Sequence, residues 1–254
     1  MSSYTNSPYK DIPSELLSQY TLNGQIPVLD WWTDGTNELL QQDWSYDYID
    51  SFVSRYTLAK IKNGTEGKSP YGRKPVIDLV NAFIKYKISN LNVAVIGSTS
   101  PWIEAVLLNL NNKVTTVEYN VPESSYPNLN CVDYFKDFQK TEKKYDCIVT
   151  FSSIEHSGLG RYGDPLDPNG DIKTMEDIHG NLKDNGILVW GAPVGQDAVV
   201  WNVHRIYGKK RLPLMFNKFK QLEWFGFDKQ QLLNHTRLGD YPQPVIVLQK
   251  KINS

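Results

Sequence analysis

The side chains best suited to chemistry gather in the segment from Phe151 to Asp171. It runs about 20 residues without a helical or strand pattern, and such long loops in compact domains are usually functional or disordered. Its ionisable residues are Glu155, His156, Arg161, Asp164, Asp167 and Asp171. A histidine titrating near neutral pH can take a proton from a hydroxyl group. We therefore expect His156 to act as a general base, with Asp164 and His204 as further catalytic candidates.

The same residues allow a second hypothesis. A neutral imidazole and a carboxylate are acceptable ligands for several divalent metals. Glu155, His156 and His204 could together hold a divalent ion that lowers the pKa of a hydroxyl group. The simpler alternative is that Glu155 and His156 line a cofactor pocket or bind the amides of their own loop.

A second polar group follows the apolar segment that ends at Gly97. Dinucleotide-binding turns carry Gly-x-Gly-x-x-Gly because the backbone must approach a pyrophosphate, and only the first glycine is present. S-adenosylmethionine has no phosphate, so one glycine can suffice. Glu118 follows Gly97 by 21 residues, which suits a carboxylate that accepts the ribose hydroxyls. The residues expected to bind this cofactor are Gly97, Ser98, Thr99, Trp102, Glu118, Asp133 and Ser152, where Asp133 would accept from the adenine amino group.

Short apolar segments alternate with helical patterns from residue 90 onward. We expect strands at 91–97, 114–118, 128–132, 145–151, 186–191, 222–227 and 245–248, and helices at 76–88, 102–110 and 172–182. Ser100 should cap the second helix, with Pro101 at its first position. This alternation predicts an α/β fold with a mostly parallel sheet and helices on both faces. The carboxyl ends of such strands share one edge, so His156, His204 and Arg205 should face one cleft with Gly97.

Residues 1–72 differ from the rest of the chain in their aromatic content. The segment contains Trp31 and Trp32, and a helix expected over 42–62 would place Trp44, Tyr48, Phe52 and Tyr56 on one face. We expect residues 1–72 to form a helical cap over the cleft and residues 73–254 to form a Rossmann-like domain.

Composition excludes several classes of protein. The chain has 254 residues and a formal net charge of −1, which provides no general attraction for nucleic acid or an acidic membrane. No apolar run is long enough to cross a membrane and no secretory signal is visible, so we expect a cytoplasmic protein. Cys131 and Cys147 lie in apolar segments and should be buried thiols, whereas the run 209–211 should be a solvated helix end.

These motifs resemble known families. Residues 90–250 resemble class I S-adenosylmethionine-dependent methyltransferases. The stretches 153–164, 202–208 and 243–247 more closely resemble a family catalogued as a domain of unknown function, which covers most of the chain. Glu155-His156 is also similar to the end of a Glu-x-x-Glu-His metal motif of some methyltransferases, with Ser152 in place of the first Glu. The resemblance implies a seven-stranded Rossmann-like sheet and methyl transfer from S-adenosylmethionine.

The acceptor is expected to be a hydroxyl group of a small molecule or a sugar. Aromatic rings stack on sugar faces and carboxylates accept hydroxyl protons, which favours a glycan over a protein or nucleic acid. An alternative function is a non-catalytic Rossmann-like protein that binds a glycan or a partner. A third, a nucleotide-sugar or NAD enzyme, is disfavoured by the missing glycines.

Overall fold

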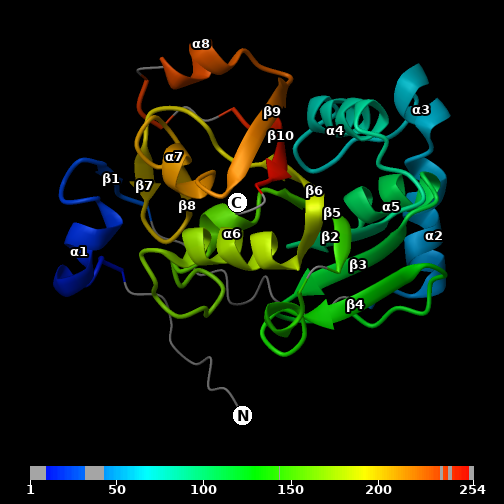
Figure 1. Ribbon diagram of the computed structural model, residues 1–254, viewed down its shortest axis with the longest axis horizontal. Coiled ribbons are helices and arrows are strands. Elements are labelled where there is room, and N and C mark those ends of the chain that lie inside the picture. The colour runs from blue at the N-terminus through cyan, green and yellow to red at the C-terminus, as the bar shows by residue number, and fades with distance from the viewer. Residues whose placement is uncertain (1–9, 32–42, 143, 235–236, 240–241, 252–254) are drawn as a thin grey trace.

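The centre of the protein is a seven-stranded sheet with the order β4-β3-β2-β5-β6-β10-β9 (Figure 1). The computed structural model describes residues 10–31, 43–142, 144–234, 237–239 and 242–251. The strands are β2 (Asn92–Ile96), β3 (Lys113–Glu118), β4 (Leu129–Asp133), β5 (Tyr145–Phe151), β6 (Leu182–Gly191), β9 (Phe219–Phe225) and β10 (Val245–Lys250). Strand β10 is antiparallel to both neighbours, and the five strands from β4 to β6 are parallel. The expected α/β fold is confirmed.

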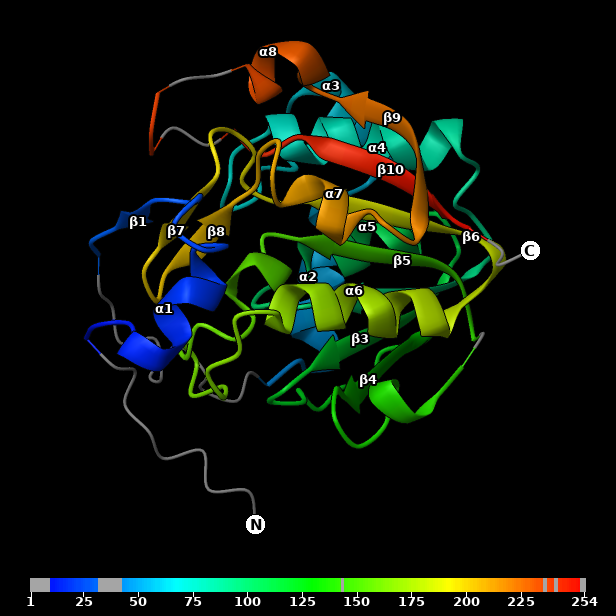
Figure 2. The same ribbon diagram turned by 60° about the vertical axis from the view of Figure 1, so that its left-hand side comes forward.

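Helices cover both faces of this sheet (Figure 2). The helices on one face are α2 (Tyr46–Arg55), α3 (Leu58–Asn63), α4 (Lys74–Lys85) and α5 (Trp102–Asn109). The other face carries α6 (Gly170–Asn181) and α7 (Leu212–Met215), and α8 (Lys229–Leu233) precedes β10. The central strands are therefore buried on both sides, which explains their continuous apolar runs.

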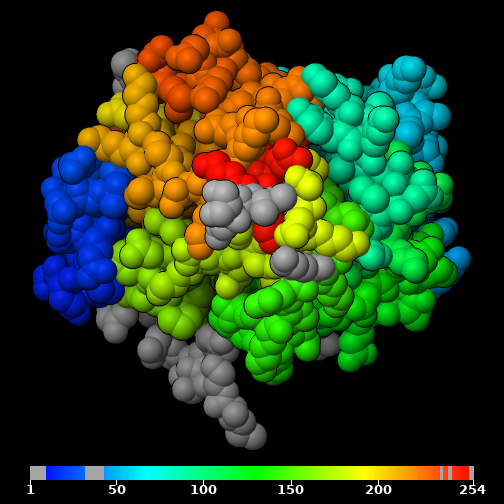
Figure 3. Space-filling view, in the orientation of Figure 1, coloured from blue at the N-terminus to red at the C-terminus, as the bar shows by residue number. Residues whose placement is uncertain are grey.

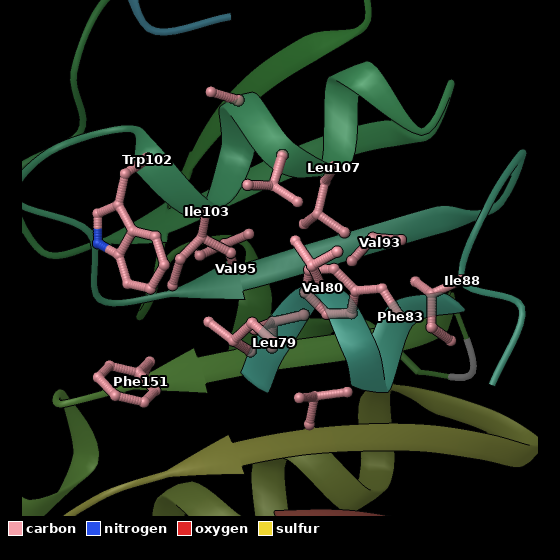
Figure 4. Packing of buried hydrophobic residues seen from close by; sticks show 14 of the residues in the cluster. Leu79, Val80, Phe83, Ile88, Val93, Val95, Trp102, Ile103, Leu107 and Phe151 are labelled. Carbon is pink, nitrogen blue, oxygen red and sulfur yellow. The ribbon is translucent and has the colours of Figure 1, made fainter. Parts of the chain in front are cut away.

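Alternate residues of β2 supply two separate cores. Val93 and Val95 point into the cluster under α4 and α5, whereas Ala94 and Ile96 point into the cluster under α6 and α7. Figure 4 shows the first cluster, where side chains of α4, such as Phe83, and of α5 pack against β2. This alternation follows from the two-residue repeat of a strand.

A second, three-stranded sheet lies at one side of the molecule. It joins β1 (Val28–Leu29), β7 (Ala198–Val200) and β8 (His204–Ile206) in the order β1-β7-β8. The preceding helix α1 (Ser14–Tyr20) ends at Tyr20, whose ring packs edge-on against Trp201 with centroids 5.3 Å apart. In Figure 3 this N-terminal segment, in blue, abuts the yellow-green and orange segments at one side of the molecule.

Three local expectations are wrong. The helix predicted over 42–62 is two helices. Helix α2 ends with Tyr56 as its C-cap, and the Thr57 side chain caps α3 by accepting a hydrogen bond from the Lys60 amide. Pro101, not Ser100, is the N-cap of α5. The stretch containing His204, predicted as a loop, pairs with β7 as strand β8.

The described part of residues 1–72 does not form one continuous cap. Helix α1 and β1 lie with the small sheet, whereas α2 packs beside α5 and α3 beside α4 at the other side of the molecule (Figure 1). Trp44 is fully buried there, Trp31 is 65% exposed, and Trp32 lies outside the described residues.

Two further findings concern the thiols and the helices. Cys147 is buried and Cys131 is partly buried, and both are free thiols. Among the helices of the described ranges, none combines the length and apolar character that a membrane crossing requires.

Candidate functional site

A cavity of about 530 Å³ lies at the carboxyl ends of β2, β3 and β5. This volume is within the range of small-molecule sites. Of the residues singled out from the sequence, Gly97, Ser98, Thr99, Trp102, Glu118, Ser152, His156, Asp164 and His204 line it. Asp133 and Glu155 do not. The tertiary fold thus brings the Gly97 turn, the end of β3 and the loop after β5 to one place.

The turn after β2 requires a glycine at its first position. Gly97 has φ +75°, a conformation that residues with a side chain rarely adopt, and an added Cβ would collide with the Ser153 side chain. The loops that follow β2 and β5 therefore touch at this point. Ser152, which begins the second loop, also has a positive φ, and its hydroxyl accepts from the Gln243 side chain at 3.3 Å.

Glu118 ends β3 beside this turn. Its carboxyl group accepts a hydrogen bond from the Ser98 amide, and burial raises its pKa to about 7. The rings of Tyr119 and Tyr134 also line the cavity and meet edge-on, with centroids 5.4 Å apart. The cavity lining therefore combines a carboxyl group, the Gly97 turn and aromatic rings.

Asp133 lies outside this arrangement. Its carboxylate accepts from the amides of Phe135 and Lys136 at 2.9 and 2.8 Å and pairs with the Lys136 ammonium group at 3.0 Å. The acid stabilises the turn that follows β4, and the next residue, Tyr134, contacts the cavity instead.

His156 also lines the cavity, on a short 3-10 turn, η3 (Ile154–His156). Its Nδ1 atom is hydrogen-bonded to the Val203 carbonyl oxygen. Since a carbonyl only accepts, Nδ1 carries the proton and Nε2 has a free lone pair. Burial lowers the pKa of His156 to about 3, so the ring is neutral at physiological pH. The ring centroids of His156 and His204 lie 6.3 Å apart. Burial, and to a smaller extent the positive charge of Arg161, lowers the pKa of His204 to about 4.

Asp164 has a different partner from the one expected. Instead of orienting His156, its carboxylate accepts from the amides of Gly158 at 2.7 Å and Tyr162 at 3.3 Å. Asp164 therefore fixes the shape of its own loop at the cavity wall, and Val203 performs the orienting task.

The proposed metal ligands lie near one another, but the described part of the chain shows no metal site. Glu155 is fully buried behind the cavity, and its Oε1 atom lies 3.8 Å from His156 Nε2. Burial raises the pKa of Glu155 to about 7. Among the described residues, no group of three or more histidine, cysteine or acidic side chains has a geometry that could hold a metal ion.

The comparisons with known proteins agree with this architecture. A family model described as "Caenorhabditis protein of unknown function, DUF268" matches residues 90–247. The chain belongs to the DUF268 family. No curated protein sequence matches it.

Solved structures show which fold this DUF268 chain has. It is similar to the 1,6-didemethyltoxoflavin-N1-methyltransferase of Burkholderia thailandensis, solved with S-adenosylhomocysteine, at a TM-score of 0.51 and 13% identity over 88% of this chain and 94% of that one. N-methyltransferase NodS of Bradyrhizobium japonicum, also solved with S-adenosylhomocysteine, gives a TM-score of 0.47 and 10% identity over 81% and 97% of the two chains. The toxoflavin enzyme match shows that the fold is that of the class I methyltransferases.

A buried ion-pair cluster holds the site loop of this DUF268 chain from behind. Arg205 does not face the cavity. Its guanidinium group is fully buried and donates to the Ser157 carbonyl at 2.6 Å. Arg211, expected to be solvated, is 1% exposed, and its Nε atom donates to Asp171 at 2.8 Å. Asp171 lies between the two guanidinium groups, which hold its pKa below the usual value against the effect of burial.

One important residue of the site was missed from the sequence. Glu104 is fully buried in α5 beneath the Gly97 turn, and its carboxyl group contacts the hydroxyl groups of Ser98 and Thr116. A signal was available, because Glu104 is the one charged residue between positions 102 and 110. A lone acid in an otherwise apolar helix has to find polar partners inside the protein.

Proposed function

We propose that this protein is an S-adenosylmethionine-dependent methyltransferase that acts on a hydroxyl group of a small molecule or a sugar. The observation that carries the proposal is the composition of the cavity. Glu118, the Gly97 turn and a neutral histidine whose Nδ1 atom is bound to the Val203 carbonyl all line one cavity. A methyl donor and a proton acceptor must face one another across such a site.

Part of the cavity lining fits the cofactor chemically. The Glu118 carboxyl group can accept from ribose hydroxyl groups, and the faces of Tyr119 and Tyr134 suit a purine ring. The Gly97 turn also lines the cavity, and S-adenosylmethionine does not need the close backbone approach that a pyrophosphate requires. When bound, the cofactor supplies an activated methyl group, so the protein has to align the acceptor and take up its proton.

Other residues of the cavity lining suit a polar acceptor. His156 Nε2 is free to accept the proton of a hydroxyl group. Tyr71 and Tyr162 provide ring faces, and Gln243 provides an amide group. Rings beside hydrogen-bonding groups are the usual requirement for a sugar, which has apolar faces and hydroxyl edges. The preference for oxygen as the methylated atom rests on this need for a base.

Ligand-induced stabilisation tests the cofactor. S-adenosylhomocysteine should raise the melting temperature, because a ligand at 100 times its Kd stabilises the native state by about 2.7 kcal/mol. Glu118→Ala should remove most of this shift. Asp133→Ala is the matched control, since this acid lies outside the cavity, and it should keep the shift. Stabilisation by NADH but not by S-adenosylhomocysteine would contradict the proposal.

A second candidate is a binding protein without catalytic activity. The observation in its favour is that the Glu118 carboxyl group already accepts a hydrogen bond from the Ser98 amide, which leaves fewer acceptor positions for a ribose. Incubation with methyl-labelled S-adenosylmethionine and a panel of sugars and small hydroxylated compounds separates the two. Label transfer supports the enzyme, whereas tight binding of a glycan without any transfer supports the binding protein.

A further inference from the structure

Glu104 occupies an unusual position for an acid. It has no exposed surface, and the side chains around it in α5 are apolar, including Ile103 and Val106. Burial raises the pKa of its carboxyl group to about 7, although the hydroxyl groups of Ser98 and Thr116 oppose the shift. No ion pair to Glu104 is found in the described part of the chain.

The hydrogen bonds around Glu104 are all satisfied when it is neutral. Thr116 Oγ1 donates to Glu104 Oε1 at 2.9 Å. Ser98 Oγ lies 3.1 Å from both Glu104 Oε2 and the Ser100 carbonyl oxygen, yet a hydroxyl group has one proton to donate. If Glu104 Oε2 carries a proton, it donates to Ser98 Oγ, and the Ser98 hydroxyl donates to Ser100. An ionised Glu104 would leave one of these acceptors without a donor.

Ser98 connects this buried acid to the cavity. Its side chain binds Glu104 below the turn, while its main-chain amide donates to Glu118 at the cavity wall. The two acids therefore hold one residue from opposite directions. The neighbouring Gly97 is already constrained by its positive φ and its contact with Ser153, so rotation of Ser98 would displace the amide.

We propose that Glu104 is a positioning residue for the cofactor turn, in which its neutral carboxyl group holds the Ser98 hydroxyl and so fixes the Ser98 amide and the Glu118 carboxyl group for binding. This inference rests on the proposed function, since it concerns affinity for the same cofactor. The titratable groups that face this cluster are Glu118 on β3 and the Cys131 thiol on β4. Ionisation of Glu104 places a second negative charge near Glu118 and weakens the turn.

Calorimetric Kd values for S-adenosylhomocysteine near pH 6 test the inference. Glu104→Gln should keep the affinity within about 3-fold, because an amide reproduces the donor and acceptor of a neutral carboxyl group. Glu104→Leu and Ser98→Ala should each weaken binding about 10-fold, the value of one well-placed hydrogen bond. The double variant should be no weaker than either single one, because both break the same contact.

The control is Val106→Ala, which creates a cavity in α5 two residues away without touching Ser98. It should lower the melting temperature and leave the Kd unchanged. Equal weakening by Val106→Ala, additive losses in the double variant, or an unchanged Kd in Glu104→Leu would overturn the inference.

A pH profile gives a second readout that does not depend on the Leu variant folding. Wild-type affinity should fall as the pH rises above about 7, and the fall should be smaller in Glu104→Gln. Identical profiles would overturn the inference while leaving the proposed function intact. A wild-type protein that does not bind S-adenosylhomocysteine at all would overturn both.

Discussion

The Nδ1 atom of His156 is hydrogen-bonded to the main-chain carbonyl oxygen of Val203. This contact joins the loop after β5 to the residue that precedes β8, and it selects the tautomer of the ring. A main-chain carbonyl cannot be removed by mutation or by protonation, so the lone pair on Nε2 is available over a wide pH range. Val203 and His156 also show how the small sheet takes part in the site, because the residue that orients the candidate base immediately precedes β8.

Replacement of this histidine should affect turnover more than binding. We expect His156→Ala to lower the rate of methyl transfer about 10²- to 10⁴-fold, the usual contribution of a general base. The Kd for S-adenosylhomocysteine should change little, because the residues proposed to hold this cofactor are Glu118 and the Gly97 turn. His179→Ala is the control, since this ring binds the Lys251 carbonyl away from the cavity. Full activity in His156→Ala would contradict a role as base.

Metal dependence can be tested separately. Because Glu155, His156 and His204 are not arranged as a three-ligand site in the described structure, we expect a chelator to leave both activity and melting temperature unchanged. His204→Ala should then cost less activity than His156→Ala. Loss of activity on chelation, with recovery on adding a divalent metal, would favour the metal arrangement instead.

Gly97→Ala should damage both the fold and the site. The substitution combines an unfavourable φ with a collision against Ser153, and such strain costs about 1–3 kcal/mol. Urea unfolding should show this loss, and affinity for S-adenosylhomocysteine should fall. Gly180→Ala is the matched control. This glycine lies in α6 with open space around it, so an alanine should stabilise the helix by about 0.5–1 kcal/mol.

Removal of residues 1–72 should produce an aggregating protein. The described part of this segment contributes β1 to the small sheet and buries Tyr20, Trp44 and Tyr56 against the rest of the chain. Its loss exposes the apolar surfaces that these side chains cover. Light scattering and far-UV circular dichroism of the 73–254 fragment test this expectation. A monomeric fragment with a cooperative melting transition would show that residues 1–72 are an independent appendage.

The buried acid beneath the turn predicts a pH dependence of stability. The pKa of Glu104 is raised from 4.5 to about 7, so its contribution is fully present below pH 4.5 and is lost as the pH rises through 7. Relative to wild type, Glu104→Gln should therefore gain stability across this window, up to about 3 kcal/mol. Urea unfolding at a series of pH values measures the difference, in which the contributions of groups that do not interact with Glu104 cancel. A constant difference from pH 4 to 9 would contradict it.

Local pattern was enough to predict the seven strands of the large sheet and helices α5 and α6. The core strands are apolar on both faces, so Val93 to Ile96 read as one continuous run, and the glycine that ends it marks the turn. The rule that parallel strands end at one edge then predicted that Gly97, Glu118 and His156 would meet, and all three line the cavity. Each strand and the turn that follows it can be recognised from a few consecutive residues.

Contacts between distant segments decided the rest. Strand β7 pairs with Val28 and Leu29, about 170 residues earlier, and the His156 ring is bound by Val203, 47 residues later, so both contacts exist only in the folded chain. The partners of Asp164 and Asp133 could not be predicted for a related reason, because a carboxylate binds whichever donors the folded backbone presents. Arg211 ends a basic run but is a buried partner of Asp171. A charged group can be buried where an opposite charge and hydrogen-bond partners surround it, and only the folded structure shows where they do.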